Sequence, residues 1–267
     1  MVEAFFNLTR SPFSRDIPVD ALLETASLKE MHQRLQYVAK ARSFGVFTGD
    51  AGTGKSTALR KFSQTLDANR YRVLYVSDSA LTPRNFYWEV LHQLGCTPAF
   101  YRGDAKRQLH KALEQVVENE HKSPVVIVDE AHLLSREMLE EIRFLLNHKM
   151  DSYSSLALIL TGQTELREML RLQVNDAIAQ RVDMRHHLNP LAKDETRQYV
   201  QRHMEAAGAS QNIFTEAALG VMHDYCGGVP RRLNKMAILC LMTACSRNYT
   251  LVDDHLVRVV IETEFEQ

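Results

Sequence analysis

Apolar and polar positions follow two different periods before Asn189. Short apolar runs, rich in β-branched and aromatic residues, are typical of buried strands. They span 44–48, 71–76, 124–128 and 156–161. Longer stretches have the spacing or composition of amphipathic helices. They span 27–42, 84–94, 108–119 and 135–148. Because strands alternate with helices, the sequence predicts an α/β domain, in which helices cover both faces of a parallel sheet.

The pattern changes at Asn189-Pro190-Leu191, and beyond it the sequence predicts helices only. Glycines and a proline separate these helices. They span 193–207, 214–225, 230–246 and 252–262. We therefore expect an N-terminal arm over residues 1–26, an α/β domain over 27–190 and a small all-helical domain over 191–267.

The segment Gly49–Ser56 reads G-x-x-x-x-G-K-[ST] and lies between an apolar run and a helix-favouring stretch. This is the context that a phosphate-binding loop requires. Its glycines let backbone N–H groups turn inward, and the helix N-terminus adds partial positive charge. We expect Lys55 to reach the β- and γ-phosphates of a nucleotide and Ser56 to ligate Mg²⁺. The residues expected to bind nucleotide here are Gly49, Asp50, Ala51, Gly52, Thr53, Gly54, Lys55, Ser56 and Thr57.

Two carboxylates, Asp129 and Glu130, follow the β-branched run 124–128, at the strand end where α/β folds place ligands. We expect Asp129 to hold the Mg²⁺ shell and Glu130 to orient and deprotonate an attacking water. The alternative is a strand that ends in two solvated acids. Thr161 and Gln163, at the end of the next run, would lie between these carboxylates and the γ-phosphate.

The two acids begin the tetrad Asp-Glu-Ala-His, which ends at His132. The tetrad invites a helicase interpretation, but we expect the chain to be too short for two helicase motor domains. We interpret His132 as a relay or packing residue beside the site rather than as a metal ligand.

Residues 3–18 contain three phenylalanines and two prolines among polar residues, and they fit neither a helix nor a strand. Two interpretations stay open. The segment is a docking arm that covers a hydrophobic edge, or it is one wall of the adenine pocket, because an arm upstream of the first strand can fold over the base.

Composition narrows the class of protein. The 267 residues, 45% of them hydrophobic and 24% charged, are ordinary for a soluble globular protein with a sizeable core. The formal net charge of −1 excludes a global basic field, so any contact with nucleic acid must be local. No apolar run approaches a membrane span, no signal-peptide pattern opens the chain and the four cysteines form no C-x-x-C pair. We expect a cytoplasmic protein with reduced thiols and no membrane partner.

These motifs, in this order, resemble the AAA+ ATPases over nearly the whole chain. Gly49–Ser56 matches Walker A, and Val126–Glu130 matches Walker B. The resemblance implies a P-loop AAA+ three-layer sandwich followed by a helical lid, with ATP and Mg²⁺ as cofactors. It also implies sensor 1 at Thr161 or Gln163.

The same resemblance gives roles to two arginines. Arg181 follows a helical stretch from Asp176 and corresponds to the arginine finger, whereas Arg231 in Gly228-Val229-Pro230-Arg231 corresponds to sensor 2. A planar, permanently charged guanidinium is suited to a transferring phosphoryl group. A finger acts in trans, which implies a ring or helical filament of identical subunits. The alternatives are a surface arginine at 181 and a helix-start arginine packed on an acid at 231, and Arg232 competes for the sensor 2 role.

A finer resemblance is to the ExeA/GspA group. It includes the ATPase part of a type II secretion assembly factor and ATPases similar to the transposition regulators TnsC, MuB and IstB. The resemblance is carried by Phe5–Leu8, Pro12-Phe13, 48–56, 128–132, 160–163, Gln180-Arg181 and Gly227–Asn234.

Secretion members are longer, with a membrane span and a peptidoglycan-binding part that this sequence lacks, so we favour the transposition branch. That branch implies an ATP-dependent oligomer on duplex DNA that selects target DNA and activates a transposase, with a target-selection protein as a further partner. One alternative is a secretion or assembly ATPase that acts on a protein without binding DNA. Another is a nucleotide-gated signalling switch with little turnover.

DNA contact would need a local basic face. The stretch 101–111 carries four basic residues against one acid, Asp104, and the loop from Ser77 leads to another arginine. In family members that enclose DNA, segments after the second strand line the channel. We expect sequence-independent, salt-sensitive phosphate contacts. The alternative is a solvated helix face. The candidate contacts are Arg84, Arg102, Lys106 and Arg107.

Overall fold

The computed structural model describes residues 2–14, 17–78, 81–146 and 154–265. Contacts divide the chain into two compact units. The α/β unit comprises Ser27–Ala51 and Lys55–Leu188, and the helical unit comprises Met1–Ala26, Gly52–Gly54 and Asn189–Gln267. The expected domain limits at 26 and 190 remain a prediction. Parts of the expected arm, 77–83 loop, 135–148 helix and helical domain lie outside the described residues, namely 1, 15–16, 79–80, 147–148 and 266–267.

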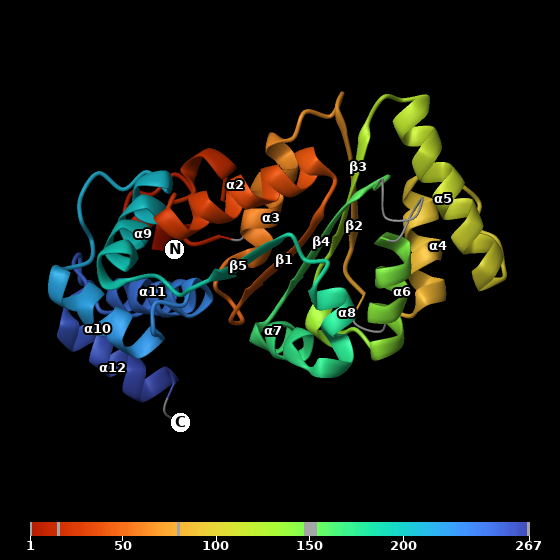
Figure 1. The fold of residues 1–267 in the computed structure, drawn as a ribbon. Coiled ribbons are helices and arrows are strands. Elements are labelled where there is room, and N and C mark those ends of the chain that lie inside the picture. Colours follow the sequence, from red (N-terminus) through yellow and green to blue (C-terminus); the bar gives the residue numbers. More distant parts are fainter. Residues whose placement is uncertain (1, 15–16, 79–80, 147–153, 266–267) are drawn as a thin grey trace. The chain divides into compact units, whose positions relative to one another are not determined.

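The α/β unit is built on a five-stranded parallel sheet in the order β2-β3-β4-β1-β5 (Figure 1). Its strands are β1 (Phe44–Gly49), β2 (Tyr71–Val76), β3 (Ser123–Val128), β4 (Ala157–Gly162) and β5 (Met184–Leu188). The predicted fold class is confirmed. The polar sequence Met-Arg-His-His-Leu of β5 predicts no strand by itself, and its pairing with β1 makes it one.

Consecutive residues of each buried strand face opposite layers. Val126 and Val128 pack in one core cluster with helices α4 (Pro83–Gln93), α5 (Arg102–Glu118) and α6 (Arg136–Leu146). Val125 and Ile127 pack in another with α2 (Ala26–Ala41) and α3 (Lys55–Thr65). Helices therefore cover both faces of the sheet (Figure 1). The helices of this unit are α2 (Ala26–Ala41), α3 (Lys55–Thr65), α4 (Pro83–Gln93), α5 (Arg102–Glu118), α6 (Arg136–Leu146), α7 (Thr164–Arg171) and α8 (Asp176–Ala179).

Two helices of the α/β unit differ from expectation. Helix α5 begins at Arg102 rather than at Gln108, because buried Ala105 extends its apolar stripe toward the N-terminus. Helix α7 lies between β4 and the expected helical stretch from Asp176, where the sequence alone indicated no element. It buries only Leu166 and Leu170 among charged residues, so its apolar face is narrow.

The helical unit contains the four predicted helices: α9 (Lys193–Ala206), α10 (Glu216–Cys226), α11 (Pro230–Ser246) and α12 (Asp254–Glu264). Side chains cap two of them, since Thr215 Oγ1 accepts from the Ala218 N–H at 3.1 Å and Asp253 Oδ1 from the Leu256 N–H at 2.8 Å. None of the helices in the described part of the chain has the length and apolarity that crossing a membrane requires.

The N-terminal arm packs on the helical unit. It contains the short helix α1 (Val2–Phe5), and its Leu8 and Phe13 are buried in the core that α9–α12 share. Phe13 stacks on His203 of α9, with 5.2 Å between ring centroids. These contacts support the docking-arm interpretation.

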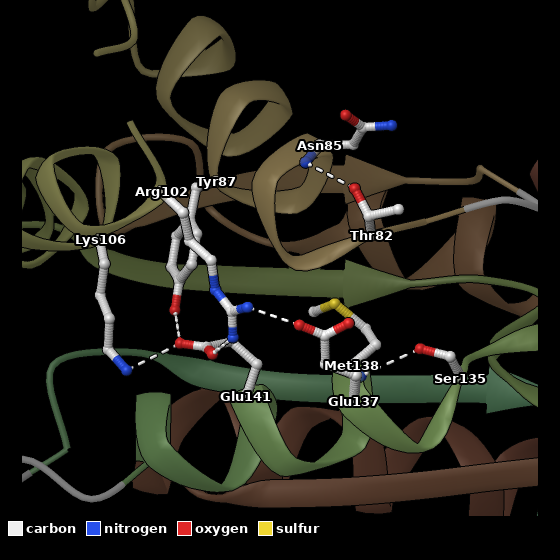
Figure 2. Close-up of polar contacts among 9 residues, drawn as sticks. All are labelled: Thr82, Asn85, Tyr87, Arg102, Lys106, Ser135, Glu137, Met138 and Glu141. Atoms are coloured by element: carbon white, nitrogen blue, oxygen red, sulfur yellow. Dashed lines mark hydrogen bonds and ion pairs between the residues drawn. The ribbon is translucent and has the colours of Figure 1, made fainter. Parts of the chain in front are cut away.

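A buried carboxylate links three helices of the α/β unit (Figure 2). Glu141 of α6 accepts hydrogen bonds from Tyr87 of α4 and from Arg102 and Lys106 of α5, the last at 2.7 Å. Arg102 also contacts Glu137 at 2.5 Å. Burial alone would raise the pKa of Glu141, but the bonds from Lys106, Tyr87 and Arg102 outweigh it and lower that pKa to about 2.

We predict that Glu141→Gln lowers the free energy of unfolding by about 2 kcal/mol at pH 7, since charged hydrogen bonds are lost and two cations lose their carboxylate. The lowered pKa means that the carboxylate stabilises the fold fully above about pH 4.5, and that this contribution fades as pH falls toward 2. Urea unfolding at pH 7, 5 and 3 should therefore show the gap between variant and wild type closing below pH 4.5. Exposed Glu140→Gln is the control, and a pH-independent gap would contradict the prediction.

Candidate active site

The phosphate-binding loop connects β1 to α3. Two of its glycines have positive φ, +84° at Gly52 and +103° at Gly54, a conformation that L side chains rarely adopt. The Lys55 side chain turns back on the loop, where its Nζ donates to the carbonyls of Gly49 at 2.7 Å and Asp50 at 3.0 Å. Lys55 is only 8% exposed, so a buried cation lies within the loop, as binding of polyphosphate requires.

The Asp129 carboxylate is the meeting point of four segments. Oδ1 accepts hydrogen bonds from Thr161 Oγ1 at 2.5 Å and from the Glu130 N–H at 2.9 Å. Oδ2 accepts from Tyr75 OH at 2.7 Å and from Ser56 Oγ at 3.3 Å. Asp129 is 5% exposed and Thr161 is fully buried, so these bonds hold a preorganised carboxylate.

Tyr75 is a site residue that sequence reasoning missed. Burial and the hydrogen bond to Asp129 both raise its pKa, so the phenol is a neutral donor. Gln93 of α4 anchors the backbone of Tyr75 on both sides, since its amide accepts from the Tyr75 N–H at 3.0 Å and donates to the Tyr75 carbonyl at 2.8 Å. No local sequence pattern marks this residue. Tyr75 lies near Asp129 because β2 pairs with β3, and that pairing becomes known only with the order of the strands in the sheet.

Glu130 and Gln163 flank the ring of His132. Glu130 has a left-handed backbone with φ 52° and ψ 33°, and its Oε2 is 3.4 Å from His132 Nδ1. The Gln163 side-chain amide is 3.0 Å from His132 Nε2. Thr164, the next residue, donates to the Asp50 carboxylate at 2.7 Å. The structure thus joins the expected water-activating acid, one sensor candidate and the phosphate loop through polar contacts of 2.7–3.4 Å.

The donors at this site suit a hard divalent cation. Asp129 and Ser56 offer a carboxylate and a hydroxyl oxygen, the ligand types that Mg²⁺ takes beside phosphate and water. Within the described residues, no group of three or more His, Cys, Asp or Glu side chains forms a separate metal cage. The residues therefore fit a metal that arrives with a nucleotide.

The two arginine candidates are placed within their own units. Arg181 follows α8 in the α/β unit and is half-buried, with its N–H donating to the Ile178 carbonyl at 3.1 Å. Arg231 is exposed in the first turn of α11, and its N–H donates to the Gly52 carbonyl at 3.2 Å, a contact inside the helical unit. Arg232 lies over the Tyr225 ring at 5.8 Å. The finger and sensor 2 roles stay predictions.

The four DNA-contact candidates all have partners within the α/β unit. Arg102 and Lys106 hold the buried Glu141 (Figure 2). Arg107 pairs with Asp104. Arg84 lies over the exposed Phe100 ring, 4.5 Å from its centroid. Arg102 and Lys106 would give up ion pairs with Glu141 on turning toward a phosphate, whereas Arg84 would leave its contact with the exposed Phe100 ring.

Known proteins resemble this chain over part or most of its length. Residues 38–170 match the family model described as an AAA domain. The chain is 32% identical over 252 residues to general secretion pathway protein A of Aeromonas hydrophila, covering 92% of this chain and 45% of that protein. It is 29% identical over 124 residues to ATP-dependent target DNA activator B of Escherichia phage Mu, covering 46% of this chain and 37% of that protein.

A solved structure of Drosophila ORC bound to DNA has the same fold, with a TM-score of 0.71, 16% identity and coverage of 97% of this chain and 64% of that one. This chain spans less than half the length of the two curated relatives above. This chain is therefore an AAA+ protein with an AAA domain at residues 38–170. It is similar both to general secretion pathway protein A and to the Mu target DNA activator.

Proposed function

We propose that this protein is an ATPase that uses Mg²⁺ and assembles with itself when ATP is bound. The observation that carries the proposal is the convergence on Asp129 of Ser56 from the phosphate loop and Thr161 from β4, with Glu130 next in sequence. A nucleotide-binding loop, an oxygen ligand set and a second acid in reach of water are the parts that phosphoryl transfer to water needs.

The chain's own residues have separable roles in this reaction. Backbone N–H groups of Gly49–Ser56 and the Lys55 ammonium bind and orient the phosphates. Ser56 and Asp129 hold the metal, which neutralises developing charge on the phosphate oxygens when it is bound. Glu130 accepts the proton of the attacking water. Thr161 and Gln163 place polar groups between the carboxylates and the γ-phosphate. Arg181 of a neighbouring subunit stabilises the transferring group, and Arg231 contacts the nucleotide from the lid.

We further propose that the assembly forms on duplex DNA and regulates transposition, by selecting target DNA and activating a transposase. Support comes from the relative in phage Mu, which is described as an ATP-dependent target DNA activator, and from the DNA-bound state of the Drosophila structure. A target-selection protein would be a further partner. Contacts would be made to phosphates, through Arg84 first and then through Arg102, Lys106 and Arg107.

A second function is favoured by a different observation. The match to general secretion pathway protein A covers 92% of this chain, against 46% for the Mu activator. The alternative is therefore a secretion or assembly ATPase that acts on a protein partner and has no affinity for DNA.

We predict that Lys55→Ala weakens ATP binding at least about tenfold, because the buried ammonium is the strongest cation at the phosphates. Titration calorimetry with ATP measures the change. Lys40→Ala, which removes an exposed lysine of α2, should leave the affinity unchanged. Tight ATP binding by the Lys55 variant would refute the phosphate site.

Glu130→Gln should bind ATP normally and lower kcat about a hundredfold or more, since an amide cannot take a proton from water. Glu130 has a left-handed backbone conformation. Glutamine has the same shape as glutamate, so the substitution adds no strain at this position. Steady-state turnover and ATP affinity are measured on the same preparation, and particle size shows whether the assembly stays locked. An unchanged rate would remove Glu130 as the water-activating residue.

Binding to duplex DNA should require ATP or a non-hydrolysable analogue, should fail with ADP, and should weaken about tenfold or more between 50 and 200 mM salt. Anisotropy and light scattering on the same samples measure binding and growth into large assemblies. In a plot of the logarithm of DNA affinity against the logarithm of salt concentration, Arg84→Ala should reduce the slope by about one. Arg202→Ala on α9 should leave the slope unchanged. ATP turnover without any DNA affinity would contradict the transposition proposal and favour the secretion alternative.

A further inference from the structure

A cavity opens on the helical unit between α9, α10 and the loop that joins them. Its volume is about 240 Å³. Buried apolar side chains from all three segments form its inner wall, and all the lining residues belong to one compact unit. The apolar wall consists of Val200, Met204, Ile213, Phe214 and Leu219. The cavity is therefore complete within the helical unit and owes nothing to the nucleotide site.

The loop between α9 and α10 is fixed at both ends by backbone hydrogen bonds. At its start, the Ala209 N–H donates to the Met204 carbonyl at 3.0 Å. At its end, the Val252 N–H donates to the Ile213 carbonyl at 2.8 Å. The Thr215 N–H donates to the Val252 carbonyl at 3.0 Å. The cavity is therefore preformed, and a ligand that enters it does not have to order the loop.

The N-terminal arm supports the same loop. The Thr9 N–H donates to the Ala207 carbonyl at 2.8 Å, directly after α9 ends. Gly208 follows with φ +93°, and a Cβ at this glycine would lie 2.9 Å from Thr9 Oγ1. Phe13 of the arm packs edge-on against Phe214, with 6.5 Å between the ring centroids. The arm thus holds both the start of the loop and one side chain of the cavity wall.

The rim of the cavity is polar and carries a single charge. Glu205 is the only ionisable side chain among the lining residues, and none of the described residues forms an ion pair with it. The other polar side chains of the rim also have no hydrogen-bond partner in the described part of the chain. They are Gln201, Ser210, Gln211 and Asn212. The rim therefore favours a ligand with a positive charge and its own hydrogen-bonding groups, and disfavours phosphate and other anions.

The volume of the cavity limits the size of its ligand. Small-molecule and cofactor sites usually measure about 300–1,000 Å³. An apolar cavity of about 150 Å³ already holds a benzene molecule. At about 240 Å³, this cavity suits one large apolar side chain and part of the backbone that carries it. The amides at the rim match the N–H and C=O groups of such a backbone.

We propose that this cavity binds a short segment of a partner protein. A leucine or phenylalanine side chain of the segment would fill the cavity, and a lysine or arginine beside it would pair with Glu205. An apolar side chain that enters a preformed pocket is a typical anchor of a protein interface. Neither ATP turnover nor DNA binding is needed for such docking.

Methyl NMR on the full chain, with labelled methionine and isoleucine methyl groups, tests the proposal with tetrapeptides blocked at both ends. The probes are Ala-Phe-Lys-Ala and Ala-Leu-Lys-Ala, and the matched controls are Ala-Phe-Glu-Ala and Ala-Ala-Lys-Ala. We expect saturable shifts at Met204 and Ile213 with a Kd of about 1 mM for the probes. The controls should bind at least about fivefold more weakly, because one lacks the cation and the other lacks the apolar side chain.

Glu205→Gln should bind the lysine and glutamate peptides equally, since the apolar wall is unchanged and the charge is lost. Glu262→Gln, which alters an exposed acid of α12 outside the cavity lining, should keep the preference for lysine. Lysine peptides that shift neither methyl group at up to about 10 mM would overturn the proposal. So would wild-type protein that binds the lysine and glutamate peptides equally.

Two further outcomes would assign the cavity to another occupant and overturn the peptide. Phenethylamine that binds at least as tightly as Ala-Phe-Lys-Ala would make a small amine the ligand. Shifts of Met204 and Ile213 that depend on protein concentration without any peptide would make a second copy of the chain the occupant. None of these results bears on ATP turnover or DNA affinity, so the proposed function is tested separately.

Discussion

The Asp129 carboxylate is the contact on which the site depends. It follows β3, and it is bound by side chains from β2, β4 and the first turn of α3, so one anion fixes the mutual positions of four segments. Because Asp129 is nearly buried, bulk water cannot take the place of its carboxylate as the acceptor of these hydrogen bonds. Each donor also belongs to another part of the unit, since Tyr75 lies in the edge strand, Ser56 in the phosphate loop and Thr161 in the strand that leads to Gln163. Order at the Asp129 carboxylate and order in the sheet therefore depend on the same hydrogen bonds.

Two glutamates in the α/β unit have the same side chain but different environments, and these environments suit them to different roles. Glu141 is buried, receives two cations and a phenol, and is held as an anion that joins three helices. Glu130 is half-exposed, sits on a left-handed backbone and meets one imidazole at a long distance. The first arrangement suits stability and the second suits proton transfer, since a base must be able to change its charge. The basic residues that open α5 serve the first role.

The sequence was sufficient where a pattern depends on local rules. The strands before Gly49 and Asp129, the helices of the C-terminal unit and the phosphate loop all follow from periodicity and glycine chemistry, and they were predicted. The pairing of β5, the narrow helix α7 and the contact of Tyr75 with Asp129 depend on tertiary neighbours, so no local signal marks them. The positive stretch 101–111 shows the same limit. Its charge is visible in the sequence, but the buried acid that receives it lies on another helix.

The contact between Gln93 and Tyr75 has a consequence for association. Strand β2 is at the edge of the sheet, where unpaired N–H and C=O groups would accept a strand from another molecule. The Gln93 amide occupies both groups of Tyr75, as a short piece of a neighbouring strand would. Strand addition along this edge would first have to displace the Gln93 amide from Tyr75. Extension of the sheet beyond β2 by another strand would therefore cost both hydrogen bonds between Gln93 and Tyr75.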